Sequence, residues 1–256
     1  EERSTEYNEM HAAFIRATAD VYPSLTVGGP ALANKTLFLD YFLQYVRKNN
    51  LRLDYIALHN YGTGPKFLKD GTGKVTVENN INRHEGYMDV IRKNGYEKTE
   101  IVIDEWGIAT RGFANRLECP ELMFRETEVF SAYYVKLIRR LLDTGYDMSP
   151  LSICLSGQHE MVVDFSGFRN FFTLNFFKKP IYNAYVLSGK LHENILGSEN
   201  PVANLEILPT ADDDGNVSVM LSYASEYYDR ELPDLAQTLT FEGLRGDYTV
   251  KLWCID

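Results

Sequence analysis

Four short apolar runs, each followed by a helical pattern, constrain the fold of this chain more than any other feature. The runs have the length and composition of buried strands, and they lie at residues 25–27, 53–58, 101–103 and 151–155. Strands and helices in regular alternation imply parallel strands joined by right-handed crossovers. The sequence therefore predicts an α/β fold.

The expected helices have ends marked by capping residues, Gly or Pro. They cover residues 5–22, 34–48, 81–94, 121–144 and 179–191. A complete eight-unit α/β barrel takes about 250 residues. Because four units already occupy three-quarters of this chain, residues 1–195 are expected to form the second half of a (β/α)8 TIM barrel, with strands 5–8 and their helices. A half barrel would expose two sheet edges, so the missing strands are expected before Glu1, in the same gene product or another chain.

After Pro201 the apolar period changes to two, which is typical of antiparallel strands. The alternating segments are 217–221, 239–241 and 248–252, and residues 213–216 (Asp-Asp-Gly-Asn) have turn composition. We therefore expect residues 196–256 to begin an accessory β-sandwich domain.

Composition excludes several classes of partner. The net charge of −10 disfavours nucleic acid and anionic membranes, and no apolar run is long enough to span a bilayer. Three cysteines at scattered positions imply neither a disulfide framework nor a metal motif. His84, His159 and Glu160 also lack metal-ligand spacing, so no metal or other cofactor is expected.

The stretch at residues 101–107 (Ile-Val-Ile-Asp-Glu-Trp-Gly) is the strongest candidate for chemistry. A carboxylate at the C-terminal end of a parallel strand lies where α/β barrels keep their active sites. Because side chains alternate along a strand, Glu105 is expected on the face of Ile103, and Asp104 on the opposite face with Trp106. Trp106 would offer a flat wall to a sugar ring. The alternatives are an acidic turn that caps the next helix and a Trp106 that only packs in the core.

The other strand ends carry polar or Gly-rich residues as well. They are Gly28-Gly29, then His59 with Tyr61, and finally Gln158 with Glu160. Four such ends in succession would meet at one mouth of the sheet, which favours an enzymatic site.

Four segments give the chain a resemblance to a known family. They are residues 22–31 (YPSLTVGGPA), 54–61 (DYIALHNY), 101–106 (IVIDEW) and 179–185 (KPIYNAY). In order and spacing the chain resembles family 39 of the glycoside hydrolases, the retaining barrel enzymes that include β-xylosidases and α-L-iduronidases. The resemblance spans most of the chain and is weak after about Pro201.

This resemblance implies a retaining glycoside hydrolase that cleaves a terminal xyloside- or iduronide-like sugar. Glu105 would be the nucleophile that forms a glycosyl-enzyme. His59 and Tyr61 would bind the sugar, and Glu160 would be the family's sugar-binding carboxylate. Gln158 and Trp106 are expected to line the same pocket because of their positions at the strand ends.

The chain also departs from the family pattern. Asp104 replaces the usual small hydroxyl residue before the nucleophile, and Gly107 replaces the usual Asn after the tryptophan. The family keeps its acid/base in an Asn-Glu pair, but Asn8-Glu9 falls inside the first expected helix and is interpreted as a surface pair. The acid/base is therefore expected upstream of Glu1.

The expected partners are a carbohydrate substrate and the missing N-terminal half of the barrel. An alternative function is a non-catalytic carbohydrate-binding or scaffold fragment. A secreted, periplasmic or lysosomal location is favoured over the nucleus, and the sequence leaves the sugar and its anomer open.

Overall fold

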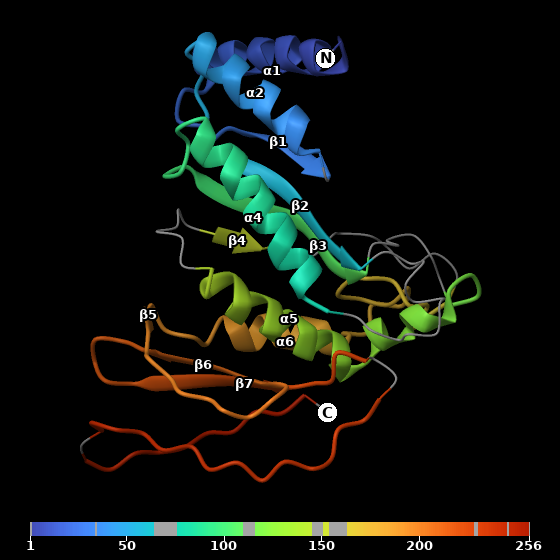
Figure 1. Cartoon of the computed structure of the whole chain (residues 1–256), viewed down its shortest axis with the longest axis vertical. Helices are drawn as coiled ribbons and strands as arrows, with labels where there is room; N and C mark the ends of the chain where they lie inside the picture. The colour runs from blue at the N-terminus through green and yellow to red at the C-terminus, as the bar shows by residue number, and fades with distance from the viewer. Residues whose placement is uncertain are drawn as a thin grey trace.

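The structure, a computed structural model, describes residues 2–33, 35–63, 76–109, 116–144, 151–153, 163–227, 230–244 and 246–255. Strands and helices alternate through its first part (Figure 1). Four strands form one sheet in the order β1-β2-β3-β4, and every neighbouring pair is parallel. They are β1 (Gly28–Ala33), β2 (Tyr55–Thr63), β3 (Glu100–Ala109) and β4 (Leu151–Ile153). The predicted mixed α/β fold with a parallel sheet is confirmed.

The helices follow the predicted order. They are α1 (Glu2–Val21), α2 (Thr36–Lys48), α4 (Glu78–Lys93), α5 (Glu128–Leu142), α6 (Pro180–Ser188) and a 3-10 helix, η1 (Pro120–Glu126). One expected helix, 121–144, is divided in two at Thr127. Thr127 has extended backbone angles, and its side chain accepts a hydrogen bond from the Val129 N–H at 3.3 Å. Thr127 is therefore the N-cap that starts α5 afresh.

The first strand begins later than the sequence pattern predicted. The run 25–27 is not a strand, because the Val27 N–H donates to the Asp54 side chain at 2.8 Å instead of to a neighbouring strand. The ladder starts at Gly28, which pairs with Tyr55. A Cβ on Gly28 would lie 2.5 Å from atoms of Tyr55, so this close approach requires a glycine.

Two clusters of buried apolar residues pack between the parallel sheet and its helices. The first joins β2 to α2 and α4, and α2 contributes Leu39, Phe42, Leu43 and Val46, which follow the i, i+3, i+4, i+7 spacing of one helix face. The second joins β3 to α5 and α6. The helices thus bury the sheet face opposite to His59 and Tyr61.

A second sheet lies on the other side of α5 and α6 from the parallel sheet (Figure 1). It contains β5 (Asn194–Ile195), β6 (Leu205–Ala211) and β7 (Val217–Tyr223), which are antiparallel. The predicted turn at 213–216 joins β6 to β7, and the Asp212 side chain accepts N–H bonds from Asp214 and Asn216. Gly215 supplies the positive φ, +85°, that this turn needs.

Two expected strands, 239–241 and 248–252, are wrong. Residues 230–244 and 246–255 contain no strand, and Val250 and Leu252 are 87% and 90% exposed. An alternating pattern forms a strand only where a neighbour completes its hydrogen bonds, and here no described strand does so. The domain division at 195/196, the half barrel and the β-sandwich stay predictions.

None of the helices among the described residues is both long and apolar enough to cross a membrane.

Candidate active site

The C-terminal ends of β2 and β3 bring three of the predicted site residues together. Side chains alternate regularly along β2. Ile56 and Leu58 are buried against the helices, and Asn60, between His59 and Tyr61, is buried on the same face. His59 and Tyr61 therefore share the opposite face, and both reach Glu105 on β3.

β3 contains a β-bulge at Asp104, next to the candidate nucleophile Glu105. At a bulge of this kind, one strand of the ladder has one residue more than its partner. Ile103 pairs with Leu58, but the next pair is Glu105 with His59, so Asp104 has no partner in the register. The predicted alternation across this stretch is wrong for that reason. Asp104 and Glu105 both lie beside His59 instead of on opposite faces.

Trp106 consequently belongs to the core and not to the sugar-binding wall that the sequence suggested. Its side chain has no exposed surface, and it joins the cluster that contains Ile103. The ring stacks on Phe130 with centroids 5.2 Å apart, and Nε1 donates to the Tyr185 hydroxyl at 2.7 Å. The interpretation of Trp106 as a packing residue, left open by the sequence, is the one that this burial supports.

Three side chains converge on the Glu105 carboxylate. The Tyr61 hydroxyl donates to Oε2, Arg169 Nη2 donates to the same oxygen at 3.1 Å, and His59 Nδ1 lies 3.4 Å from it. Burial alone would raise the pKa of Glu105. The hydrogen bonds from Tyr61 and Arg169 and the nearby charges outweigh burial and lower the pKa, so Glu105 is held as a carboxylate.

Tyr61 and Asp104 are shifted in the opposite sense. Burial, followed by the hydrogen bond to Glu105, raises the pKa of Tyr61 well above its ordinary value, so the phenol stays protonated as a donor. Burial also raises the pKa of Asp104, against the lowering effect of His59. Two neighbouring carboxyl groups thus differ in their readiness to ionise.

Arg169 is the site residue that sequence reasoning missed. It lies 64 positions after Glu105, is almost fully buried, and also donates from Nη1 to the Trp106 carbonyl at 3.0 Å. Its guanidinium carbon stands 4.3 Å from the centre of the Tyr61 ring. The available signal was a single arginine within an aromatic run, residues 165–172, where a charged side chain requires a partner.

A buried ion pair anchors the loop that carries Arg169. Lys179 Nζ lies 2.7 Å from Glu126 Oε1 and donates to the Phe168 carbonyl at 2.6 Å and to Asn170 Oδ1 at 2.9 Å. Glu126 Oε1 also accepts the Gly167 N–H at 2.6 Å. Because both charged groups are buried and hydrogen-bonded, they fix the loop on either side of Arg169.

Arg125 adds a second tie to the same loop. Its guanidinium donates to the Ala109 carbonyl at the end of β3, at 2.8 Å, and to the Gly167 carbonyl at 3.3 Å. Complete burial and then the neighbouring Arg169 lower the pKa of Arg125 to about 9. The arginine thus links the strand that holds Glu105 to the loop that holds Arg169.

Gln158 and Glu160 lie outside the described residues, so their predicted places beside Glu105 stay predictions. Among the residues that are described, no group of three or more His, Cys, Asp or Glu side chains could hold a metal ion.

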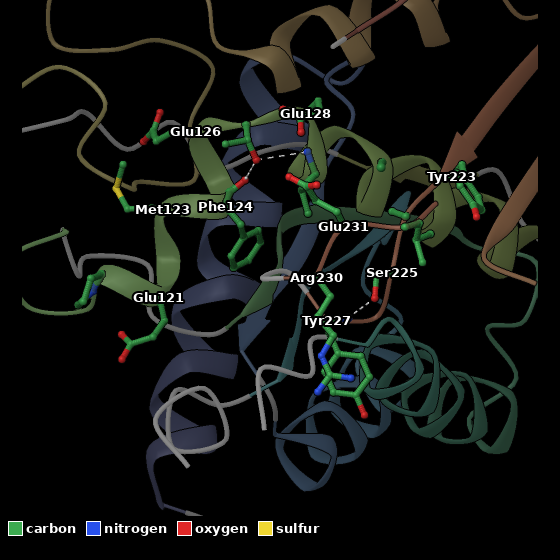
Figure 2. Close-up of a pocket in the computed structure, with 16 residues that line it drawn as sticks. Glu121, Met123, Phe124, Glu126, Glu128, Tyr223, Ser225, Tyr227, Arg230 and Glu231 are labelled. Atoms are coloured by element: carbon green, nitrogen blue, oxygen red, sulfur yellow. Dashed lines mark hydrogen bonds between the residues drawn. The ribbon is translucent and has the colours of Figure 1, made fainter. Parts of the chain in front are cut away.

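A cavity of about 740 Å³ lies elsewhere, between η1 with the start of α5 and the segment that follows β7 (Figure 2). In it the Arg230 guanidinium stacks over the Tyr227 ring at 3.9 Å. Glu105 does not line this cavity, but Glu126, the partner of Lys179, does. The cavity therefore adjoins the support of the Arg169 loop and not the strand-end cluster itself.

Comparison with known proteins identifies the family. The model of "Glycosyl hydrolases family 39" matches residues 2–255. Comparison with curated protein sequences found no match.

Solved structures agree in fold. A monomeric β-xylosidase from Caulobacter crescentus CB15 is 18% identical, with a TM-score of 0.62 over 89% of this chain and 46% of its own. A glucosidase from Croceicoccus marinus is 21% identical, with a TM-score of 0.61 over 86% and 44%. The bacterial orthologue of human α-L-iduronidase is 18% identical, with a TM-score of 0.66 over 89% and 41%.

The chain spans less than half the length of each of these three proteins. At these identities the structural likeness concerns the fold alone, whereas the family match covers nearly every residue of the chain. The strand-end cluster around Glu105 lies within that match, and so the chain belongs to family 39 of the glycosyl hydrolases.

Proposed function

We propose that this chain supplies the nucleophile of a retaining glycoside hydrolase that cleaves a terminal xyloside- or iduronide-like sugar. The observation that carries the proposal is the state of Glu105. It stands at the C-terminal end of a parallel strand as a carboxylate with lowered pKa, beside two hydrogen-bond donors and a histidine. A nucleophilic carboxylate must be ionised before it attacks, and this surrounding favours that state.

Glu105 attacks the anomeric carbon in this mechanism and forms a glycosyl-enzyme, which water then hydrolyses with retention. As the ester forms, Glu105 loses its negative charge. The Tyr61 hydroxyl and the Arg169 guanidinium fix the carboxylate on one oxygen, Oε2, and leave the other to react. Positioning of this kind raises the rate by holding the attacking atom in a productive geometry.

The leaving oxygen also needs a proton, and a retaining enzyme places a second carboxyl group about 5–5.5 Å from the nucleophile to give it. This chain covers less than half of each of the three solved relatives. We propose that the acid/base belongs to the part of the enzyme that corresponds to the remainder of those proteins. His59 and Tyr61 would border the sugar, and Gln158 and Glu160 would reach it from the end of β4.

The decisive experiment is covalent trapping in the assembled enzyme. An activated 2-deoxy-2-fluoro glycoside should accumulate as an ester on Glu105, located by peptide mass spectrometry. Glu105→Ala should reduce turnover of an aryl glycoside by several orders of magnitude, with partial rescue by azide, since nucleophile removal is among the costliest changes in such sites.

Glu100 offers a matched control, because it is a glutamate at the opposite end of the same strand. Glu100→Ala should leave labelling at Glu105 intact. A label on another residue, or near-normal turnover by Glu105→Ala, would remove Glu105 from the mechanism. Sugar binding with no label at all would point to the non-catalytic alternative.

A further inference from the structure

The bulge in β3 gives His59 a carboxyl group at each ring nitrogen. Nδ1 lies 3.4 Å from Glu105 Oε2, and Nε2 lies 3.7 Å from Asp104 Oδ1. The His59 side chain is 19% exposed. Asp104 Oδ1 has no accessible surface, and within the described part of the chain it has no hydrogen-bond partner. A buried acceptor oxygen without a hydrogen bond, beside the edge of an imidazole, requires an explanation.

The two contacts are chemically complementary. Ionised Glu105 can only accept, so the neighbouring Nδ1 must carry the proton. On the other side of the ring, Nε2 faces Asp104 Oδ1 at 3.7 Å, which is an electrostatic contact and longer than a hydrogen bond. An imidazole with its proton on Nδ1 presents the Nε2 lone pair to Asp104. The Nδ1–H then lies beside Glu105 Oε2, 3.4 Å away.

The other groups packed around His59 have partners elsewhere or carry no charge, so Asp104 is the group beside Nε2. The Tyr61 ring on the same strand meets the imidazole edge to face, 5.8 Å between centroids. Arg169 donates to Glu105 and to the Trp106 carbonyl, and Tyr87 from α4 donates to the His59 carbonyl oxygen at 3.3 Å. The described partner of His59 in β1 is Ala33, which has no charge.

We propose that Asp104 is a positioning residue, which orients the His59 ring so that Nδ1–H donates to the Glu105 carboxylate. The contact itself is independent of the proposed reaction, and only its effect on turnover rests on the proposed function. This role reverses the expectation from strand alternation, by which Asp104 would point away from the site.

The first test reads the ring directly in the chain of residues 1–256. Long-range ¹H–¹⁵N spectra of the imidazoles, with His59 assigned through His59→Gln, should change at both ring nitrogens in Asp104→Ala. Asp104→Asn should stay close to wild type, because an amide can donate to Nε2 or accept from it. Asp40, which pairs with Lys93 at 2.8 Å on the outer helices, supplies the control Asp40→Asn.

Unchanged His59 resonances in Asp104→Ala would overturn the proposal, and so would an equal change in Asp40→Asn. A thermal melt checks that each variant is folded. If Asp104→Ala does not fold, the same spectra are recorded for Asp104→Leu. Its side chain has neither a donor nor an acceptor, so it is expected to perturb the His59 signals as strongly.

The second test is a double-mutant cycle on the kcat of the assembled enzyme. Asp104→Ala should lower kcat about tenfold when His59 is present and less than about twofold in a His59→Phe background, since contacting residues are coupled by this order of energy. Multiplicative losses would overturn the role through His59. If the assembled enzyme shows no glycosidase turnover, only the proposed function is refuted. The spectra test the contact between Asp104 and His59 independently of turnover.

Discussion

At the scale of single residues, Arg169 makes two contacts that a shorter side chain cannot reproduce together. It donates to Glu105 Oε2 and to the Trp106 carbonyl. Arg169→Ala should raise the pKa of Glu105, because a donor and a positive charge are lost, so the acid limb of the kcat/KM profile should move to higher pH. Arg169→Lys should restore part of the charge effect but not the paired geometry. An acid limb that stays in place in Arg169→Ala would contradict this assignment.

His84 on α4 is expected to make the stability of the fold depend on pH. It is fully buried, and burial lowers its pKa from 6.5 to about 4. The unfolded chain therefore binds more protons between these values, and the folded state should lose stability as the pH falls through that window. The loss from this one residue is at most about 3 kcal/mol.

Urea unfolding at pH 7 and pH 4.5 measures this effect. His84→Gln has no titrating ring and should show a smaller difference between the two pH values than wild type does. An equal difference in the variant and in wild type would assign the acid sensitivity to other groups.

At the scale of elements, Asn80 ties the start of α4 to the ends of two strands. Its side-chain amide donates to the Asn60 carbonyl at 3.2 Å, to Asn60 Oδ1 at 3.0 Å and to the Gly107 carbonyl at 3.3 Å. Asn80→Ala should lower the free energy of unfolding by about 2–4 kcal/mol, because buried acceptors lose their donor. Exposed Asn82 on the same helix is the control, and Asn82→Ala should change stability by less than about 0.5 kcal/mol. Equal effects in denaturant unfolding would contradict the assignment.

The elements also show what the sequence could and could not predict. Local patterns were sufficient to locate β2, although it ends at Thr63 and not at Leu58, and to locate the turn 213–216 and the strand β7 that follows it; β6 was not predicted. The start of β1 was wrong because pairing with Tyr55, and not local propensity, decides where that ladder begins. No residue type in β3 encodes its bulge, and Arg169 reaches Glu105 only through the folding of a distant loop.

At the scale of the whole molecule, β1 and β4 stand at the two edges of the parallel sheet. Residues 1–256 alone should hydrolyse aryl xylosides, glucosides and iduronides no faster than background, because the reaction needs a second carboxyl group and an enclosed site. Adding the proposed complementary part of the enzyme, expressed separately, should restore turnover. Full activity of the lone chain would place the acid/base within it and would contradict the expectation that this residue lies upstream of Glu1.

The bulge at Asp104 also shifts the alternation of inward and outward side chains along β3 by one residue. Before it, odd-numbered residues such as Ile101 and Ile103 face the helices, and after it even-numbered residues such as Trp106 and Ile108 do. An ungapped comparison of this strand with one that lacks the bulge will therefore match core positions with site positions on one side of residue 104. A substitution in β3 therefore has to take account of whether its position comes before or after Asp104. An error of one residue would place the change in the core instead of the site, or the reverse.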